Sequence, residues 1–207
     1  MSHTFFDLTF TPSVKRAQEH FGTRRNYERF EGGEPDFRGL TDEEADFIAL
    51  RDSFYLATVG ENGQPYVQFR GGPAGFLKAL DPMTLGYADF GGNLQYISTG
   101  NLSANDKAAL ILMDYPSRRR LKILARVEIT DVADDPELTT KLRVPGYKAK
   151  IERSVLLHVQ AFDWNCPRHI TPRYTLEEIR ELTRPLNEHI QSLETEIRDL
   201  KRQIQIT

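Results

Sequence analysis

From residue 53 onward, the period of apolar and polar positions changes to one typical of β-strands. Residues 53–59 are rich in aromatic and β-branched side chains, and in residues 154–163 apolar positions alternate with polar or smaller ones. Turn-forming residues separate some of these stretches, as in Glu61-Asn62-Gly63, where Asn and Gly accept a positive φ, and at Asp81-Pro82. Closely spaced strands linked mostly by hairpins predict an antiparallel barrel. The seven predicted strands cover residues 53–59, 65–70, 75–80, 84–88, 107–114, 120–131 and 154–163. The strand at 107–114 is apolar enough to be buried on both sides.

Capping residues predict helices between and before the strands. Thr41 and Glu44 form a capping box, in which the hydroxyl and the carboxylate satisfy free N–H groups, so a helix is expected from about residue 42 to 52. The other predicted helices cover residues 11–22, 101–106 and 135–143. The fold class expected from these elements is mainly β with flanking helices (α+β), arranged as an antiparallel barrel.

The C-terminal segment has a different period. Two apolar series each repeat every seven residues and interleave at spacings of four and three: Leu186, Leu193 and Leu200, and Ile190, Ile197 and Ile204. Ile at position a and Leu at position d favour a parallel two-stranded coiled coil. An amphipathic helix packed on its own domain explains the same pattern. The expected organisation is an N-terminal arm (1–40), a barrel domain (41–174) and a C-terminal amphipathic helix (175–207).

Composition excludes several classes of protein. The 207 residues include 27 Lys and Arg against 30 Asp and Glu, a net charge of −3, which argues against a general nucleic-acid binder. The longest apolar run, Ala108 to Met113, is far shorter than the roughly 20 residues of a membrane-spanning helix. No secretory signal is visible at the N-terminus, and Cys166 is the only cysteine, so a soluble cytoplasmic protein is expected.

Three segments could bind an anion. Arg70 ends a predicted strand beside two glycines, which allow close backbone approach, and its guanidinium can hold a phosphate by two hydrogen bonds. Residues 97–102 place hydroxyls and a glycine just before the predicted helix at 101–106, where free N–H groups attract anions. Residues 118–122 hold four cations, three of them on one strand face. A surface arginine, an ordinary helix cap and a solvated charge run are the alternatives.

Residues 163–174 are the densest in reactive side chains, with the only Trp, the only Cys, one His and two Arg. Cys166 and His169 are too few to complete a tetrahedral metal site, so no metal is expected. Nucleophilic Cys–His chemistry also lacks a third group.

The chain resembles the flavin-nucleotide-binding branch of the pyridoxamine 5′-phosphate oxidase-like proteins. The resemblance covers residues 53–174 and rests on the segments PYVQFRGGPAGFL, GNLQYISTGNL, RRRLKILARVEI and DWNCPRHITPRY, in that order. It implies a split β-barrel that forms a homodimer and binds FMN non-covalently, with flavin sites shared between the subunits.

The resemblance also implies roles for individual residues. Those that would hold the FMN phosphate and ribityl chain are Arg70, Ser98, Thr99, Asn101, Arg119 and Arg120. Those expected near the isoalloxazine ring are Gln68, Gln95 and, from the partner subunit, Trp164. Those on the substrate side are Arg168, His169 and Arg173. No catalytic residue is assigned, although His169 is the best candidate for proton transfer, because histidine titrates near neutral pH.

The expected function is that of an FMN-dependent oxidoreductase acting on a small molecule. NAD(P)H would dock only transiently, because the sequence has no GxGxxG pattern. One alternative is a non-catalytic flavin-binding or sensor protein whose C-terminal helix contacts a partner. Another is a haem-handling split barrel in which His158 or His169 ligates iron.

Overall fold

The computed structural model describes residues 3–164 and 167–205, which fall into two compact units. The first unit holds the N-terminal helices and the whole sheet, up to Asp114 and again from Arg119 to Arg168. The second holds the turn Tyr115–Arg118 together with the chain from His169 onward. The first unit therefore contains every residue expected to contact FMN, whereas His169 and Arg173 belong to the second.

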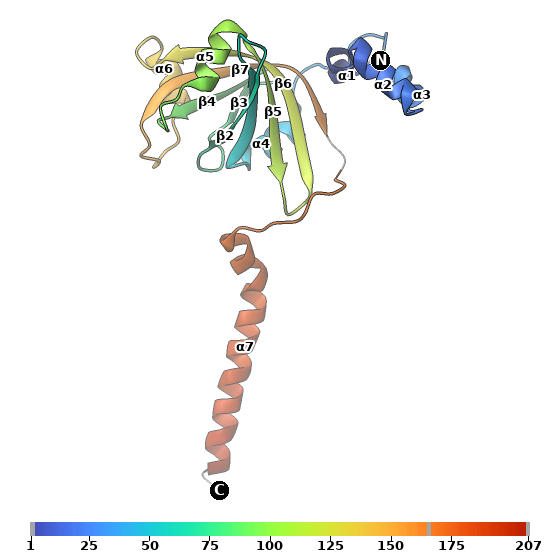
Figure 1. The fold of residues 1–207 in the computed structure, drawn as a ribbon. Coiled ribbons are helices and arrows are strands. Elements are labelled where there is room, and N and C mark those ends of the chain that lie inside the picture. Colours follow the sequence, from blue (N-terminus) through green and yellow to red (C-terminus); the bar gives the residue numbers. More distant parts are fainter. Residues whose placement is uncertain (1–2, 165–166, 206–207) are drawn as a thin grey trace. The chain divides into compact units, whose positions relative to one another are not determined.

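Seven strands form one antiparallel sheet in the order β2-β1-β5-β6-β7-β4-β3 (Figure 1). This confirms the split-barrel fold with its long C-terminal helix. Each central strand pairs with two neighbours, so β1 lies between β2 and β5, and β7 lies between β6 and β4. The strands are β1 (Ser53–Val59), β2 (Pro65–Gly71), β3 (Lys78–Asp81), β4 (Thr84–Phe90), β5 (Lys107–Asp114), β6 (Arg119–Asp131) and β7 (Ile151–Trp164).

The helices lie mostly at the ends of the chain and between strands. Lys78 of β3 donates hydrogen bonds to the carbonyls of Lys141 and Arg143, which lie at the C-terminal end of α6. The helices are α1 (Thr4–Thr9), α2 (Pro12–His20), α3 (Arg24–Tyr27), the 3₁₀-helix η1 (Glu28–Phe30), α4 (Asp42–Ala49), α5 (Ile97–Ala104), α6 (Pro136–Leu142) and α7 (Leu176–Gln205). No helix in the described part of the chain is long and apolar enough to cross a membrane.

The core forms where one face of the sheet curls around large apolar side chains. Phe54 of β1 stacks on Phe76 at a centroid distance of 5.7 Å, and both contact the ring of Tyr87 edge to face. Alternate residues of β1 and of β6 are buried, which explains the period of two in the sequence. Packing of alternate residues in the core therefore determines which side chains of these strands point to the outer face of the sheet.

Three predictions about elements were wrong in detail. The helix expected at 101–106 begins at Ile97, because Tyr96 takes a left-handed conformation (φ 53°) and starts the helix without a side-chain cap. Strand β3 begins at Lys78 and not at residue 75. Strand β5 is buried on one side only, since its outward residues Ala109, Ile111 and Met113 are half-buried.

Candidate functional site

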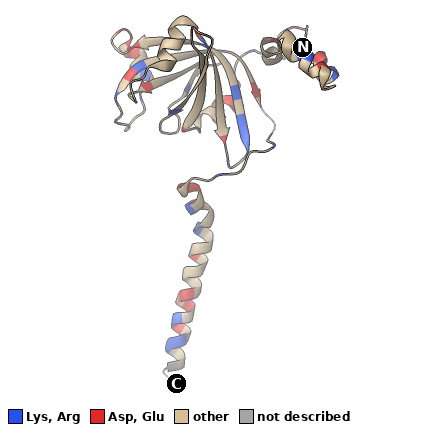
Figure 2. Cartoon of the chain, in the orientation of Figure 1, with Lys and Arg blue, Asp and Glu red and all other residues tan. Residues whose placement is uncertain are grey.

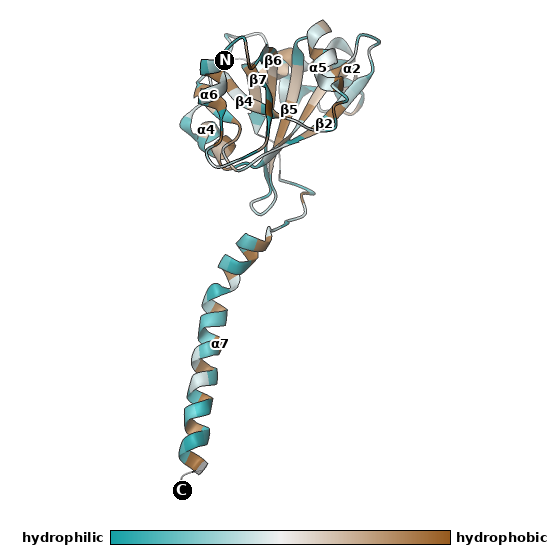
Figure 3. Cartoon of the chain, turned by 90° about the vertical axis from the view of Figure 1, so that its left-hand side faces the viewer, coloured by the Kyte–Doolittle hydropathy of each residue, from teal (hydrophilic) through white to brown (hydrophobic). Residues whose placement is uncertain are grey.

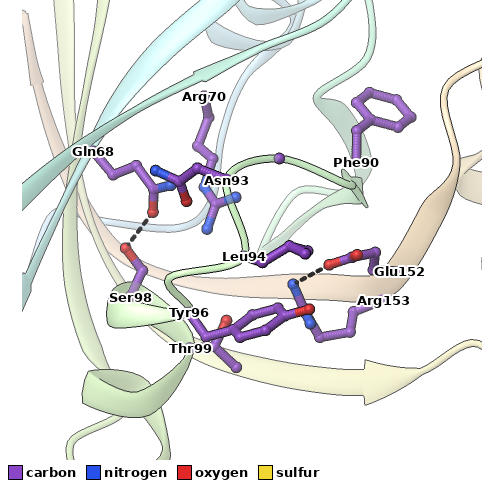
Figure 4. A pocket seen from close by; sticks show the side chains of 11 residues that line it. Gln68, Arg70, Phe90, Asn93, Leu94, Tyr96, Ser98, Thr99, Glu152 and Arg153 are labelled. Carbon is purple, nitrogen blue, oxygen red and sulfur yellow. Dashed lines mark hydrogen bonds and ion pairs between the residues drawn. The ribbon is translucent and has the colours of Figure 1, made fainter.

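A small pocket opens where the ends of β2, β4 and β7 meet the loop before α5 (Figure 4). Side chains from three strands and one helix converge here, although they are far apart in the sequence. Gln68 and Arg70 come from β2, and both point inward because alternate residues of this edge strand face the sheet interior. The lining residues are Gln68, Arg70, Phe90, Gly92, Asn93, Leu94, Tyr96, Ser98, Thr99, Glu152 and Arg153.

Asp89 is the buried charge on which two arginines of the site converge. Arg70 Nη1 lies 2.5 Å from Asp89 Oδ1, and Arg153 Nη2 lies 2.7 Å from Asp89 Oδ2. Only 3% of the Asp89 side chain is exposed, so both bonds act with little screening by water. Arg153 Nη2 also lies 3.1 Å from Glu152 Oε2. The carboxylate therefore fixes the position of both guanidinium groups.

Burial and pairing act in opposite directions on Arg153. Burial disfavours its charged form, but the hydrogen bond and the charge of Asp89 outweigh that effect and raise the pKa of Arg153. Burial also raises the pKa of Tyr87, which lies in the core near Arg70 and Asp89. Arg153 consequently stays cationic, and Tyr87 stays neutral, across the physiological pH range.

One nitrogen of Arg70 has no hydrogen-bond partner among the described residues. Its Nε is buried and makes no hydrogen bond within the described chain, while Nη1 is held by Asp89. A buried donor left unpaired is unfavourable by about 1–3 kcal/mol. An acceptor supplied by a bound molecule would remove that penalty, and an anion would do so best.

Neutral hydrogen-bonding groups line the side of the pocket near α5. Ser98 Oγ donates to Gln68 Oε1 at 2.7 Å, and Ser98 is 1% exposed. This bond ties α5 to the edge strand, and Thr99 follows in the same helix turn. Asn101 faces away from the pocket and donates from Nδ2 to Thr58 Oγ1 at 3.0 Å. Of the three α5 residues proposed to contact FMN, two line the pocket and Asn101 instead holds the helix on β1.

The loop between β4 and α5 shapes the remaining wall. Leu94 and Tyr96 both have positive φ, at 61° and 53°, a conformation uncommon for residues other than glycine. The Tyr96 ring lies under the Arg153 guanidinium, 5.0 Å from centroid to Cζ. Figure 4 shows Tyr96 and Arg153 on one side of the pocket and Gln68 with Ser98 on the other.

A second cluster lies at the far end of β7. Trp164 Nε1 donates to Glu44 Oε1 at 2.6 Å, and its ring meets Phe47 edge to face at 4.8 Å. The Arg119 guanidinium stacks on Trp164 at 4.3 Å and pairs with Glu43 at 2.5 Å. Neither Trp164 nor Arg119 lines the pocket of Arg70. Within a single chain, Trp164 and Arg119 therefore lie apart from the four proposed flavin residues that line the pocket.

Arg120 belongs to neither cluster, but it shares one property with Arg70. Its buried Nε also makes no hydrogen bond within the described chain. It does not line the pocket. Arg118, expected on the same strand face, instead has φ 56° and lies in the turn before β6, so it breaks the strand alternation.

The glycines after Arg70 have a packing role. A Cβ on Gly72 would lie 2.8 Å from Phe76 Cγ, and one on Gly71 would lie 2.9 Å from Phe69 Cε1. Both distances are shorter than side chains tolerate. The sequence predicts that these glycines let a ligand approach the backbone, whereas in the structure Phe69 and Phe76 fill the space beside them.

The remaining predicted residues lie outside the pocket. Gln95 is exposed, and its amide accepts a hydrogen bond from Asn93 at 3.2 Å. Arg168 and His169 are exposed, and His169 has φ 65°. Arg173 stacks on Tyr115 at 5.1 Å within the second unit. The Asn165-Cys166 part of the twelve-residue motif lies outside the described residues.

Sequence reasoning missed Asp89, Glu152 and Arg153. Each lies within or beside an ordinary alternating strand, and no local motif marks it. Their common signal is the β4–β7 pairing, which places Asp89 directly opposite Arg153. No group of three or more His, Cys, Asp or Glu residues among the described ones could hold a metal ion.

Comparison with known proteins agrees with this fold. The family model described as pyridoxamine 5′-phosphate oxidase matches residues 40–166. A Lactobacillus delbrueckii structure described as a candidate pyridoxamine 5′-phosphate oxidase is 25% identical, with a TM-score of 0.48, over 62% of this chain and 96% of that one. An FMN-binding protein from Syntrophomonas wolfei is 16% identical, with a TM-score of 0.44, over 60% and 85%. No curated protein matches the chain.

The split-barrel sheet and the family match together define the class. The chain belongs to the pyridoxamine 5′-phosphate oxidase family. A structure described as a haem storage protein from Vibrio cholerae is 14% identical, with a TM-score of 0.39, over 60% of this chain and 94% of that one.

Proposed function

We propose that the protein binds FMN non-covalently and acts as an oxidoreductase on a small molecule. The observation that carries the proposal is the convergence of Gln68, Arg70, Ser98 and Thr99 in one pocket. These four residues come from two segments that the family resemblance assigns to FMN. The two segments are about thirty residues apart in the sequence, and the family resemblance is the reason to expect them in one pocket.

The donors in the pocket suit a phosphate group. The unpartnered Arg70 Nε–H, the Thr99 hydroxyl and the Asn93 amide can each donate to a phosphate oxygen. The charges of Arg70 and Arg153 are balanced by Asp89 and Glu152, so attraction at long range is weak. Binding would depend on directed hydrogen bonds more than on net positive charge.

Bound FMN would supply the redox chemistry through its isoalloxazine ring. The chain's own residues would hold the cofactor, orient its ring and limit access of water. Gln68 is placed for a polar edge of the ring, because it is the inward-facing residue of β2 next to Arg70 and its side chain is held by a hydrogen bond from Ser98. NAD(P)H or another reductant would visit the site only transiently.

We also propose that the working form is a homodimer with shared flavin sites. The outer face of β2 and β1 exposes apolar side chains: Val67 is 61% exposed, Phe69 59% and Tyr55 38%. Tyr55 lies opposite Phe69 on one side and Ile111 on the other, so the apolar surface continues onto β5. A contiguous apolar sheet face of this kind is typical of a protein–protein interface. Pairing of two such faces would let Trp164 or Arg120 of one chain serve the partner's flavin.

The first experiment identifies the cofactor. Flavin released by heat from the purified protein is separated by chromatography and compared with FMN, FAD and riboflavin standards. FMN is expected, because the pocket offers donors for one terminal phosphate. FAD alone, or a red-brown haem spectrum with no flavin, would overturn the proposal.

The second experiment tests Arg70. Arg70→Ala should weaken FMN by roughly ten- to hundredfold, because a hydrogen bond to a charged group contributes about 1.5–3 kcal/mol. Riboflavin, which has no phosphate, should bind much as it does to the parent. Arg70→Lys should recover only part of the FMN affinity, since lysine cannot make the forked contact. Fluorescence quenching of both ligands by apo-protein measures the difference.

Arg126→Ala provides the matched control. Arg126 is an exposed β6 arginine that pairs with Asp106 at 2.6 Å and does not line the pocket. It should leave both affinities unchanged. Equal losses of FMN and riboflavin in Arg70→Ala would point to damaged packing and remove the phosphate assignment. Reduction of the bound flavin by NAD(P)H then separates an enzyme from a non-catalytic flavin carrier.

A further inference from the structure

Helix α7 holds all six apolar residues of the heptad seam, from Leu186 to Ile204, in one continuous helix. Upstream of Leu186 the same heptad frame continues with Ile179 at d and Leu176 at a, and all of them lie in one 30-residue helix. Pro185 stands at an outer position and Thr183 at an a position, so the uninterrupted part of the seam runs from Leu186 to Ile204. Figure 3 shows the hydrophobic stripe recurring along α7.

The seam has no cover within the second unit. Its side chains are 43–76% exposed along the helix, from Leu193 and Ile190 at the lower end of that range to Ile204 at the upper end. A single exposed leucine needs no explanation, but a continuous stripe of them on one helix face does. Hydrophobic positions spaced alternately by four and three residues fit the facing side of a second helix with the same pattern.

We propose that α7 pairs in parallel with α7 of a second copy of this chain, in register. The occupant is argued from the charges that flank the seam. In a parallel pair, each g position meets the e position five residues further along the partner helix. Glu196 at g then meets the partner's Lys201 at e, and His189 at g meets the partner's Glu194. No like charges meet at these flanking positions in the stretch from Leu186 to Ile204.

The antiparallel arrangement is disfavoured by the same residues. The antiparallel register that overlaps Leu186 to Ile204 in full brings Glu196 against Glu196 of the partner subunit and Glu194 against Glu194 of the partner subunit. Like charges facing each other across a helix pair are destabilising. Figure 2 shows acidic and basic residues mixed along α7, so net charge alone does not set the direction.

The pairing concerns residues that play no part in the proposed flavin site. The paired part of α7 is short, since 19 residues of helix span about 28 Å. A coiled coil of this length gains stability when its two helices are already tethered to each other, because tethering raises their effective concentration. A parallel coil has its twofold axis along the coil, so it is compatible with a closed twofold dimer of the sheet domains.

Disulfide trapping in the full-length chain tests both partner and direction. In a Cys166→Ser background, Leu186→Cys places one thiol at a d position, and parallel in-register helices bring it beside its own counterpart within bonding reach. Mild oxidation should convert most of this variant to a covalent dimer on a non-reducing gel. Thr195→Cys, at the outward f position, is the matched control and should remain largely uncoupled.

Co-expression of differently tagged Ile190→Cys and Leu200→Cys chains, in the same Cys166→Ser background, tests the direction. Parallel pairing should give only disulfides between identical positions, whereas the antiparallel register, in which residue 190 faces residue 200, would join these two positions. Mixed disulfides, no coupling of Leu186→Cys, or equal coupling of Thr195→Cys would each overturn the proposal. Flavin content is measured on the same samples, so that loss of flavin with intact coupling would count against the proposed function alone.

Discussion

A few buried carboxylates hold the charged side chains around them in place. Asp89 is the clearest case, because one buried carboxylate receives hydrogen bonds from both Arg70 and Arg153. It keeps the arginines ordered but also occupies donors that a ligand could use. Residues that hold a site in place and residues that bind the ligand therefore compete for the same hydrogen bonds.

We predict opposite effects of Asp89→Asn on stability and on anion binding. The free energy of unfolding should fall by about 3 kcal/mol, because two buried arginines lose their counter-charge. FMN affinity measured well below the unfolding transition should rise, since both guanidinium groups become available. Urea unfolding and FMN titration of the same preparation check the two effects. A variant that lost affinity in proportion to stability would show that Asp89 serves only to order the pocket.

Glu44 offers a second prediction at this scale, through pH. Burial raises its pKa, but hydrogen bonds from Thr41 and Trp164 outweigh burial and hold the pKa of Glu44 below its ordinary value. The stability it contributes is therefore present above that ordinary value and is lost as pH falls through the lowered one. At pH 7, Glu44→Gln should unfold at a lower urea concentration than the parent, with a free energy of unfolding lower by about 1–3 kcal/mol. The difference in free energy between the two proteins should narrow in acid.

The only tryptophan of the sequence, Trp164, reports this unfolding directly by fluorescence. Glu43→Gln is the matched control, since Glu43 is exposed and its pair with Arg119 lies at the surface. Such pairs contribute little, at most about 1 kcal/mol. A gap between parent and Glu44→Gln that stayed constant from pH 7 to pH 3 would contradict the assignment to this carboxylate.

At the scale of elements, β2 and its exit show why glycine follows Arg70. Gly72→Ala should lower the free energy of unfolding by about 1–3 kcal/mol, because the added methyl group would overlap the buried Phe76 ring. Gly100→Ala in α5 is the control: nothing lies within 4 Å of the added atom, and alanine favours the helix by up to about 1 kcal/mol. Thermal unfolding of both variants compares them. If Gly72→Ala left the free energy of unfolding unchanged, the packing role of Gly72 would be wrong and close approach of a ligand would remain as its explanation.

Elements with a strong period were predictable, and those positioned by long-range pairing were not. The strands follow from short runs rich in apolar, aromatic and β-branched residues, and α7 follows from its heptads. The start of α5 was misplaced because Ser98, Thr99 and Asn101 are typical capping residues, while the actual start is Tyr96, which has no capping side chain. Arg153 joins the pocket only through the pairing of β4 with β7, and no local pattern could reveal that.

At the scale of the whole molecule, two surfaces are proposed to hold two chains together, and they can be separated. Deleting residues 186–207 should leave a dimer of about twice the chain mass by light scattering, because the apolar face of β2 and β1 remains. Adding Val67→Glu to the shortened chain should give a monomer that loses flavin, since a buried unpaired charge is strongly unfavourable. Met83→Glu, on an exposed turn residue away from that face, should keep the dimer and its flavin.

The strand order also sets the route by which the chain can fold. Neighbouring β5 and β6 are joined by a short turn, so their contacts form with little loss of chain entropy. By contrast, β1 must find β5, as in the pair Tyr55 and Ile111, and β4 must find β7, as in the pair Thr84 and His158, across long intervening segments. Such non-local pairings slow folding. The pocket of Arg70 and Arg153 depends on these non-local strand pairings. We therefore expect it to acquire its shape in the final, slowest phase of refolding.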